Sequence, residues 1–123
     1  MKKNNSISII TVVKNNDKSI RRCIESIQNQ SFKNIQHIII DGNSSDNTLS
    51  IINEYKDKIS IIVTEEDDGI WDAMNKGINL ATGDIIGFLN ADDFYYENAL
   101  ETVDKYFENN EIDFLFGSVQ KYK

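Results

Sequence analysis

The stretch Gly83-Asp84-Ile85-Ile86-Gly87-Phe88-Leu89-Asn90-Ala91-Asp92-Asp93 is a short apolar run that ends in two adjacent carboxylates. Short apolar runs bounded by turn residues are typical of buried strands. Two carboxylates at the end of such a strand repel each other and are costly to desolvate unless a cation joins them. The stretch therefore predicts a buried strand, and it indicates a divalent metal at the strand end with a phosphate-bearing ligand beyond it.

Around that stretch, short β-branched runs alternate with segments of helical spacing. We expect strands at 7–13, 35–40, 59–63, 84–89 and 112–116, and helices at about 18–30, 48–55, 70–81 and 97–108. Runs that are apolar on both faces are typical of a mostly parallel sheet covered by helices. With right-handed crossovers, the predicted fold class is a doubly wound α/β sandwich with helices on both faces.

Individual apolar residues of these elements also carry expectations. In the helix at 70–81 we expect Ile70, Met74 and Ile78 among the residues that face the core, with Gly83 ending the helix. Cys23 lies on the apolar stripe of the first helix and is interpreted as a core residue. If Ile86 is fully buried, its replacement by alanine would cost about 2–5 kcal/mol.

Length and composition limit the classes of protein to consider. The chain has 123 residues, 40% hydrophobic and 27% charged, with a formal net charge of −7. One core fits this length, so we expect a single domain over residues 1–123. The acidic excess argues against nucleic acid as a partner. The short apolar start and the single cysteine favour a cytoplasmic chain without a transmembrane segment, free or peripheral at the inner face of the membrane.

Polar side chains follow four of the expected strands. Because the carboxyl ends of parallel strands share one edge, these residues are expected at one ligand-binding crevice. Two adjacent carboxylates about 4 Å apart would repel by roughly 4 kcal/mol at an effective dielectric near 20, and Mg²⁺ or Mn²⁺ would relieve that cost. Turn and cap roles are the alternative for any single position, and they are favoured for Asp46 and Asn47. The strand-end residues are Thr11, Lys14, Asn15, Asp41, Glu65, Glu66, Asp67, Asp68, Asp92 and Asp93.

Other common sites are missing or weak in the sequence. No Gly-x-Gly-x-x-Gly follows the first strand, and no Gly-Lys-Ser or Gly-Lys-Thr is present. The lone His37 has no cysteine or second histidine nearby, so we interpret it as structural rather than as a metal ligand.

Five motifs, taken in order, make the chain resemble the family-2 nucleotide-sugar glycosyltransferases of the GT-A fold, in their N-terminal donor-binding portion. The motifs are Ser8–Asn16, Ser26–Phe32, Ile40–Thr48, Asp67–Ile78 and Phe88–Asp93. The resemblance implies that Thr11 and Val13 line a pocket for the nucleotide base. It further implies that Asp41 and Asp67 hydrogen-bond the base and its surroundings.

The last of these motifs carries the implied metal chemistry. Asp92 would hold the ribose or help position the diphosphate, and Asp93 would coordinate Mg²⁺ or Mn²⁺, which neutralises the departing nucleoside diphosphate. The sequence departs from the family pattern at Asn90, where an acid is usual, and at Trp71, where a tyrosine is usual and where we expect the ring to pack. By resemblance, the partners are a nucleoside-diphosphate-sugar donor and a sugar or lipid-linked acceptor.

The predicted function is metal-dependent, inverting glycosyl transfer in the synthesis of a cell-surface polysaccharide. Family members continue into an acceptor-binding half that carries the general base, for which this chain offers no matching position. One alternative is therefore a fragment that binds nucleotide-sugar without turnover. A second is a receiver-like phosphoacceptor domain, although that class needs an acidic pair where this chain has Lys14-Asn15-Asn16.

Overall fold

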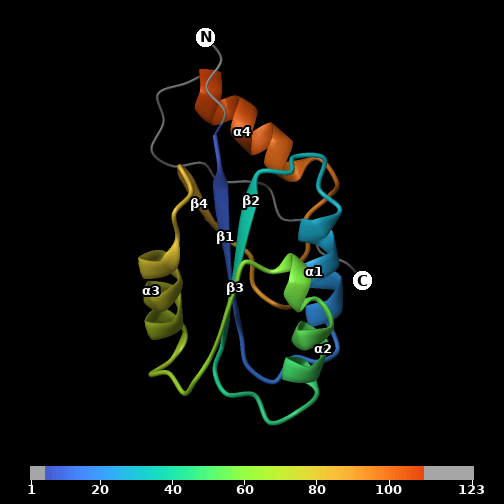
Figure 1. The fold of residues 1–123 in the computed structure, drawn as a ribbon, viewed down its shortest axis with the longest axis vertical. Coiled ribbons are helices and arrows are strands. Elements are labelled where there is room, and N and C mark those ends of the chain that lie inside the picture. Colours follow the sequence, from blue (N-terminus) through green and yellow to red (C-terminus); the bar gives the residue numbers. More distant parts are fainter. Residues whose placement is uncertain (1–4, 110–123) are drawn as a thin grey trace.

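The computed structural model describes residues 5–109, which form a four-stranded parallel sheet with helices on both faces (Figure 1). The predicted doubly wound α/β class is confirmed. The expected fifth strand at 112–116 lies outside the described residues. The elements are β1 (Ile7–Val13), α1 (Ile20–Gln28), β2 (Ile35–Asp41), α2 (Thr48–Glu54), the 3-10 helix η1 (Lys56–Lys58), β3 (Ile61–Thr64), α3 (Ile70–Leu80), β4 (Ile85–Phe88) and α4 (Ala99–Asn109).

The strands lie in the order β3-β2-β1-β4. β1 pairs with β2 from Ile7↔Ile35 to Val13↔Asp41, and with β4 from Ile7↔Ile85 to Ile10↔Phe88. Doubly wound nucleotide-binding sheets have the order 3-2-1-4, whereas receiver domains have 2-1-3-4-5. The topology therefore excludes the receiver alternative. It also places the switch in winding direction, where ligands bind in such sheets, between β1 and β4.

Two apolar layers hold the helices on the sheet. Alternate residues of β1 point to opposite faces, so Ile7 and Ile9 pack in the layer under α1, α2 and α4, while Ile10 packs under α3. Figure 1 shows α1 and α2 on one side of the sheet and α3 on the other. α3 lies so close that a side chain at Gly77 would collide with Ile10. Cys23 is buried in the larger layer, as predicted.

α3 uses a narrower contact face than the sequence predicts. Its buried residues are Ala73 and Gly77, and Ile70 and Ile78 are exposed because the close approach to the sheet leaves room only for small side chains. The prediction that Trp71 packs is wrong, because this residue is 76% exposed.

Gly83 does not end α3, contrary to the prediction. The helix ends at Leu80, and Ala81 already has an extended conformation. Instead, Gly83 lets the chain approach β1: a Cβ there would lie 2.7 Å from the backbone nitrogen of Ser8. Its own N–H donates to the Ser8 hydroxyl at 2.8 Å. The glycine therefore positions the start of β4 against β1.

β4 is buried on only one face. Ile85 belongs to the larger apolar layer, whereas Ile86 is 42% exposed and Phe88 is similarly exposed. Among the described elements, α3 packs mainly across β1 and β2, so it covers this face of β4 only in part. The expectation of a fully buried strand is therefore wrong for Ile86. The loss of about 2–5 kcal/mol expected for Ile86→Ala required full burial, so it does not apply.

His37 lies inside the larger layer. Its Nε2 is 2.9 Å from the Thr11 hydroxyl, and burial lowers its pKa to about 3. This matches the structural role predicted for His37. None of the helices within residues 5–109 has the length and apolar character needed to cross a membrane.

The difference in burial between Ile39 and Ile86 can be tested with a matched pair of alanine variants. Ile39→Ala removes a fully buried side chain and should lower the free energy of unfolding by about 2–5 kcal/mol. Ile86→Ala shortens a half-exposed side chain and should cost about 1 kcal/mol or less. Urea titration of both variants checks this, and equal losses would contradict the burial difference.

The buried His37 predicts a pH dependence of stability. The unfolded chain binds a proton on His37 below about pH 6.5, whereas the folded protein does so only near pH 3. The contribution of the neutral imidazole to the free energy of unfolding is thus fully present above about pH 6.5, and it decreases as the pH is lowered. By pH 5 the loss should be about 2 kcal/mol. His37→Gln cannot titrate and should lack this loss. The check is a urea titration of the wild type and the variant at pH 7 and pH 5. The same pH dependence in both proteins would contradict the role assigned to His37.

Candidate functional site

The carboxyl edge of the sheet is built from loops that are hydrogen-bonded to one another. The Asn15 backbone N–H donates to the Ser44 hydroxyl at 2.8 Å, and the Asn15 side-chain oxygen accepts from the Ser45 N–H at 2.7 Å. Asn15 and Asn43 have φ of 51° and 63°, a left-handed conformation that asparagine tolerates better than most residues. These bonds fix the β1–α1 loop against the β2–α2 loop, a contact that the sequence did not predict.

Asp46 and Thr48 extend this connection. The Asp46 carboxylate accepts hydrogen bonds from the backbone N–H groups of Asp17 and Thr48. Hydrogen bonds from Thr48 hold the pKa of Asp46 below its usual range. Asp46 thus accepts from the first N–H of α2 and ties the start of this helix to the β1–α1 loop. The N-cap position itself is Asn47, and the cap role predicted for Asn47 is wrong because its side chain makes no cap hydrogen bond.

Asp41 ends β2 as a fully buried residue, and both of its carboxylate oxygens accept hydrogen bonds from Ser44. The Ser44 hydroxyl donates to Oδ1 at 2.5 Å, and the Ser44 N–H donates to Oδ2 at 3.1 Å. Hydrogen bonds to both oxygens fix the orientation of this buried side chain. Asp41 is thus oriented before any ligand arrives. Sequence reasoning missed Ser44, although a serine three residues after an aspartate is a known turn pattern.

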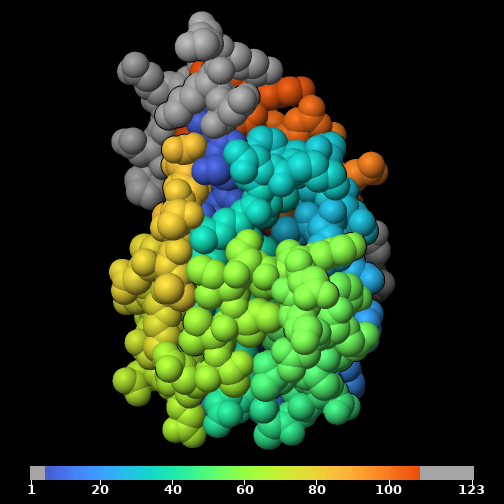
Figure 2. Space-filling model, viewed as in Figure 1, coloured from blue at the N-terminus to red at the C-terminus, as the bar shows by residue number. Residues whose placement is uncertain are grey.

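Asp67, in the loop between β3 and α3, lies beside Gly42, the residue that follows Asp41. Its Oδ2 comes within 3.0 Å of the point where a Cβ on Gly42 would stand, so the missing side chain of Gly42 makes this approach possible. Its Oδ1 accepts from the Gly69 N–H at 3.2 Å. The structure therefore brings the segments that follow β2 and β3 together, and Figure 2 shows the two adjoining at the lower end of the molecule.

Lys76 holds the β3–α3 loop onto α3. Its ammonium lies 3.0 Å from Glu65 and 3.5 Å from Asp72, and it donates to the Glu66 carbonyl at 3.2 Å. Hydrogen bonding to Glu65 is the main cause that raises the pKa of Lys76. Lys76 was not singled out from the sequence, because its partners become neighbours only when α3 folds back beside the loop.

Asp92 and Asp93 stand on a loop fastened to α1. The Ser19 hydroxyl donates to the Ala91 carbonyl at 2.9 Å, and the Asp93 N–H donates to the Asn90 carbonyl at 3.0 Å. Both aspartates are exposed, so water screens their repulsion more than the sequence argument assumed. Their exposure leaves both carboxylates accessible to a ligand.

The carboxylates of this loop raise the pKa of one buried group, Cys23, and of one partly buried group, Tyr95. Burial is the main cause that raises the pKa of Cys23 to about 12, with the Asp93 and Asp92 carboxylates adding to it. Burial likewise raises the pKa of Tyr95 to about 12, with Cys23 and Asp93 contributing. The Cys23 thiol is thus a neutral packing group and not a nucleophile.

Thr11 and Val13 differ in their position relative to this edge. Val13 is the last residue of β1, and its carbonyl accepts from the Gly42 N–H at 2.9 Å. Thr11 is fully buried and hydrogen-bonded to His37. Val13 is 7% exposed and belongs to the larger apolar layer, so neither side chain lies on an accessible surface.

The described residues can offer a metal only a small set of ligands. Within residues 5–109, no group of three or more His, Cys, Asp or Glu side chains could hold a metal ion. Mg²⁺ is commonly bound through one or two carboxylates together with the phosphates of a ligand. The exposed oxygens of Asp92 and Asp93 fit that pattern.

A family model places this chain among known proteins. The model described as glycosyl transferase family 2 matches residues 8–123. The chain belongs to this family. A PGL/p-HBAD biosynthesis glycosyltransferase of Mycobacterium bovis (strain BCG / Pasteur 1173P2) is 37% identical over 102 aligned positions, and the match covers 79% of this chain and 40% of that protein. Glycosyltransferase GlyG of Streptococcus pneumoniae serotype 4 is 29% identical over 119 residues, 94% of this chain and 40% of its own length. The chain thus spans about 40% of the length of these two relatives.

Solved structures share the fold. S. aureus TarS 1-349, in complex with UDP-GlcNAc, matches with a TM-score of 0.79 at 22% identity, over 85% of this chain and 31% of that one. Mannosyltransferase PcManGT from Pyrobaculum calidifontis, in complex with GDP-Man and Mn²⁺, matches with a TM-score of 0.69 at 22% identity, over 76% and 29% of the two chains. The fold of the family-2 chain is thus the expected GT-A fold.

The contacts of Lys76 predict how the loop carrying Asp67 behaves when they are lost. Lys76→Met keeps the length of the side chain but removes its ammonium, so hydrogen exchange at the amides of Asp68 and Gly69 should speed up a few-fold. Lys105→Met is the matched control, because its ion pair with Glu101 lies on α4. Unchanged exchange in Lys76→Met would show that the loop is held by other contacts.

Proposed function

We propose that this chain binds the nucleoside-diphosphate half of a nucleotide-sugar donor at the carboxyl edge of its sheet, as the donor-binding part of a glycosyltransferase. The observation that carries the proposal is the pairing of two kinds of acid at this edge. Asp41 is buried and oriented by Ser44, whereas Asp92 and Asp93 are exposed beside the topological switch point. A fixed acceptor suits the N–H groups of a base, and exposed acids suit a metal and a diphosphate.

The base and ribose would occupy the end of β1 and β2. Asp67, which is partly exposed beside Gly42, would accept hydrogen bonds from the base and its surroundings. Asp41 and Val13 are buried in this structure, so they would reach the base only once the loops after β1 and β2 move apart. Thr11 would support Val13 from below, since its side chain is enclosed in the apolar layer. The complexes of TarS with UDP-GlcNAc and of PcManGT with GDP-Man support a nucleotide-sugar as the ligand class.

The diphosphate would lie toward β4. Asp93 would coordinate a divalent cation, Mg²⁺ or Mn²⁺, and Asp92 would hold the ribose or help position the diphosphate. When bound, the metal supplies neutralisation of the leaving nucleoside diphosphate. The Mn²⁺ in the PcManGT complex supports this assignment. The Ser19 and Asp93 hydrogen bonds described above would keep both carboxylates at the switch point.

We further propose that the complete protein performs inverting transfer to a sugar or lipid-linked acceptor in cell-surface polysaccharide synthesis, on the cytoplasmic side. The acceptor oxygen would attack the anomeric carbon as the bond to the diphosphate breaks, and the acceptor proton would pass to a general base. No residue of this chain is assigned as that base. Donor binding without turnover is accordingly the second candidate for the chain by itself.

The metal role of Asp93 can be tested by binding. Asp93→Asn should lower the Mn²⁺-dependent affinity for a nucleoside diphosphate at least about tenfold, because it removes an anionic ligand. Folding should be intact, since the side chain is exposed. Calorimetric titration of UDP and GDP with and without Mn²⁺ measures the effect. Asp57→Asn on η1 is a matched control that removes an acid without touching the edge.

Two results would count against the proposal. One is a wild-type chain that binds neither nucleotide in the presence of metal. The other is an Asp93→Asn variant whose affinity still responds to Mn²⁺ as the wild type does. Sugar-donor hydrolysis by the wild-type chain, lost in Asp93→Asn, would separate retained chemistry from donor binding alone.

A further inference from the structure

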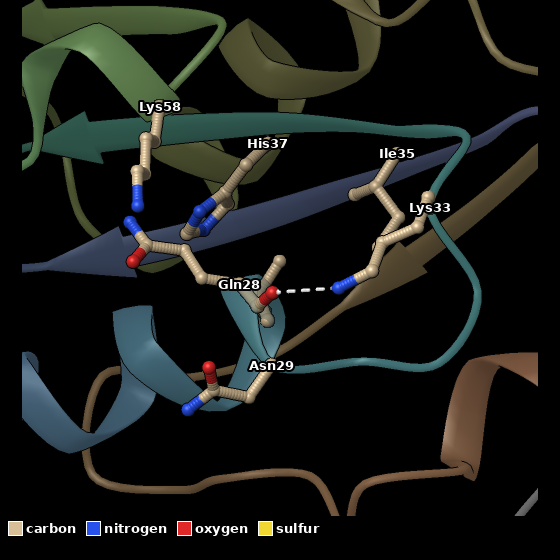
Figure 3. A pocket seen from close by; sticks show the side chains of 7 residues that line it. Gln28, Asn29, Lys33, Ile35, His37 and Lys58 are labelled. Atoms are coloured by element: carbon tan, nitrogen blue, oxygen red, sulfur yellow. Dashed lines mark hydrogen bonds between the residues drawn. The ribbon is translucent and has the colours of Figure 1, made fainter.

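A second polar pocket lies away from the carboxyl edge, between the end of α1, the start of β2 and η1 (Figure 3). Its volume is about 350 Å³, which is large enough for a small organic ligand. His37 precedes Asp41 by four residues on β2, which corresponds to about 13 Å along the strand. The pocket is thus separate from the proposed donor site. Its lining residues are Ile27, Gln28, Asn29, Lys33, Ile35, His37 and Lys58.

The charge of this pocket is opposite to that of the chain. Its lining includes two lysines and no acid, although the chain carries a net charge of −7. Lys33 already donates to the backbone carbonyl of Gln28 at 3.2 Å, which holds its ammonium at one end of the pocket. A concave surface lined by one sign of charge concentrates ions of the other sign. The pocket therefore favours an anion.

Gln28 adds a donor without a partner. Its side-chain nitrogen is the one buried side-chain nitrogen or oxygen that lacks a hydrogen bond among the described residues. Turned over, the Gln28 amide places its oxygen toward the Lys58 ammonium, which would then donate to it, so the polar end of Gln28 lies against Lys58 in either orientation. In Figure 3 the Gln28 amide and the Lys58 ammonium point toward each other, with the His37 ring beside them. Three nitrogen-bearing groups thus converge on one end of the pocket.

His37 can contribute a further donor. Its Nε2 is taken by the Thr11 hydroxyl at 2.9 Å. When Thr11 donates in this bond, the proton of the neutral imidazole resides on Nδ1, which can then donate to a ligand. Burial keeps the ring neutral by lowering its pKa to about 3, so it would act as a donor without adding charge.

We propose that this pocket binds a phosphate group between Lys58, Gln28 and His37, with Lys33 adding positive charge at its other end. A phosphate offers several acceptor oxygens and a charge that complements the two lysines. The group could be inorganic phosphate or the phosphate of a small sugar phosphate, and the two share the same contacts. The site depends on neither the metal nor the acids of the donor site.

The test is a titration of the 123-residue chain with inorganic phosphate, at constant ionic strength and in the presence of EDTA. The side-chain amide signals of Gln28 in proton–nitrogen spectra report on the pocket directly. We expect them to shift with phosphate, and Lys58→Gln to weaken this binding about tenfold. Lys56→Gln, on the same 3-10 helix but outside the lining, is the matched control and should bind phosphate as the wild type does.

A second variant covers the chance that Lys58→Gln perturbs the fold. Gln28→Met keeps the shape of the side chain and removes the unpartnered nitrogen, so it should weaken phosphate binding while leaving the phosphate-free protein at least as stable.

A hexose phosphate that binds more tightly than inorganic phosphate would identify a sugar phosphate as the ligand, and equal affinity would identify phosphate itself. Asp93→Asn should bind phosphate normally, which separates this site from the donor site. Unshifted Gln28 signals at millimolar phosphate, or equal binding by Lys58→Gln and Lys56→Gln, would overturn the proposal.

Discussion

β1 hydrogen-bonds to β2 along its whole length and to β4 over Ile7–Ile10, and its two faces lie under different helices. Every other part of the described structure is arranged around this strand. Parallel pairing on both sides means that β1, β2 and β4 all end at the same edge, so the loops that follow them must share one surface. The acids of the candidate site are neighbours for this reason, although they lie far apart in the sequence.

The edge so formed combines rigid and accessible groups. Hydrogen bonds between Asn15, Ser44 and Ser45 lock two loops together, and Ser44 also orients the buried carboxylate of Asp41. Asp92 and Asp93, in contrast, are exposed and are positioned only through the backbone of their loop. A donor site needs both, because a base is recognised by fixed acceptors whereas a metal and its diphosphate must enter from solvent.

The open face of β4 and the narrow contact of α3 share one cause. Gly77 allows α3 to sit directly on Ile10, which centres the helix over β1 and β2 and leaves Ile86 and Phe88 only partly covered. The apolar run at Ile85–Leu89 looked equally buried on both faces from its composition. Residue type reports how apolar a strand is, but which helix covers each face depends on packing elsewhere in the chain.

Periodicity and turn residues lie within each short segment, so they were enough to predict the alternation of strands and helices, the doubly wound class, and the positions of the acids at strand ends. The strand order, the burial of Thr11, the exposure of Trp71, and the partnerships of Ser44 and Lys76 could not be predicted in this way. The same holds for the pocket around Gln28, which joins α1, β2 and η1. Those features are contacts between segments distant along the chain, and they exist only once the strands have paired and the helices have packed.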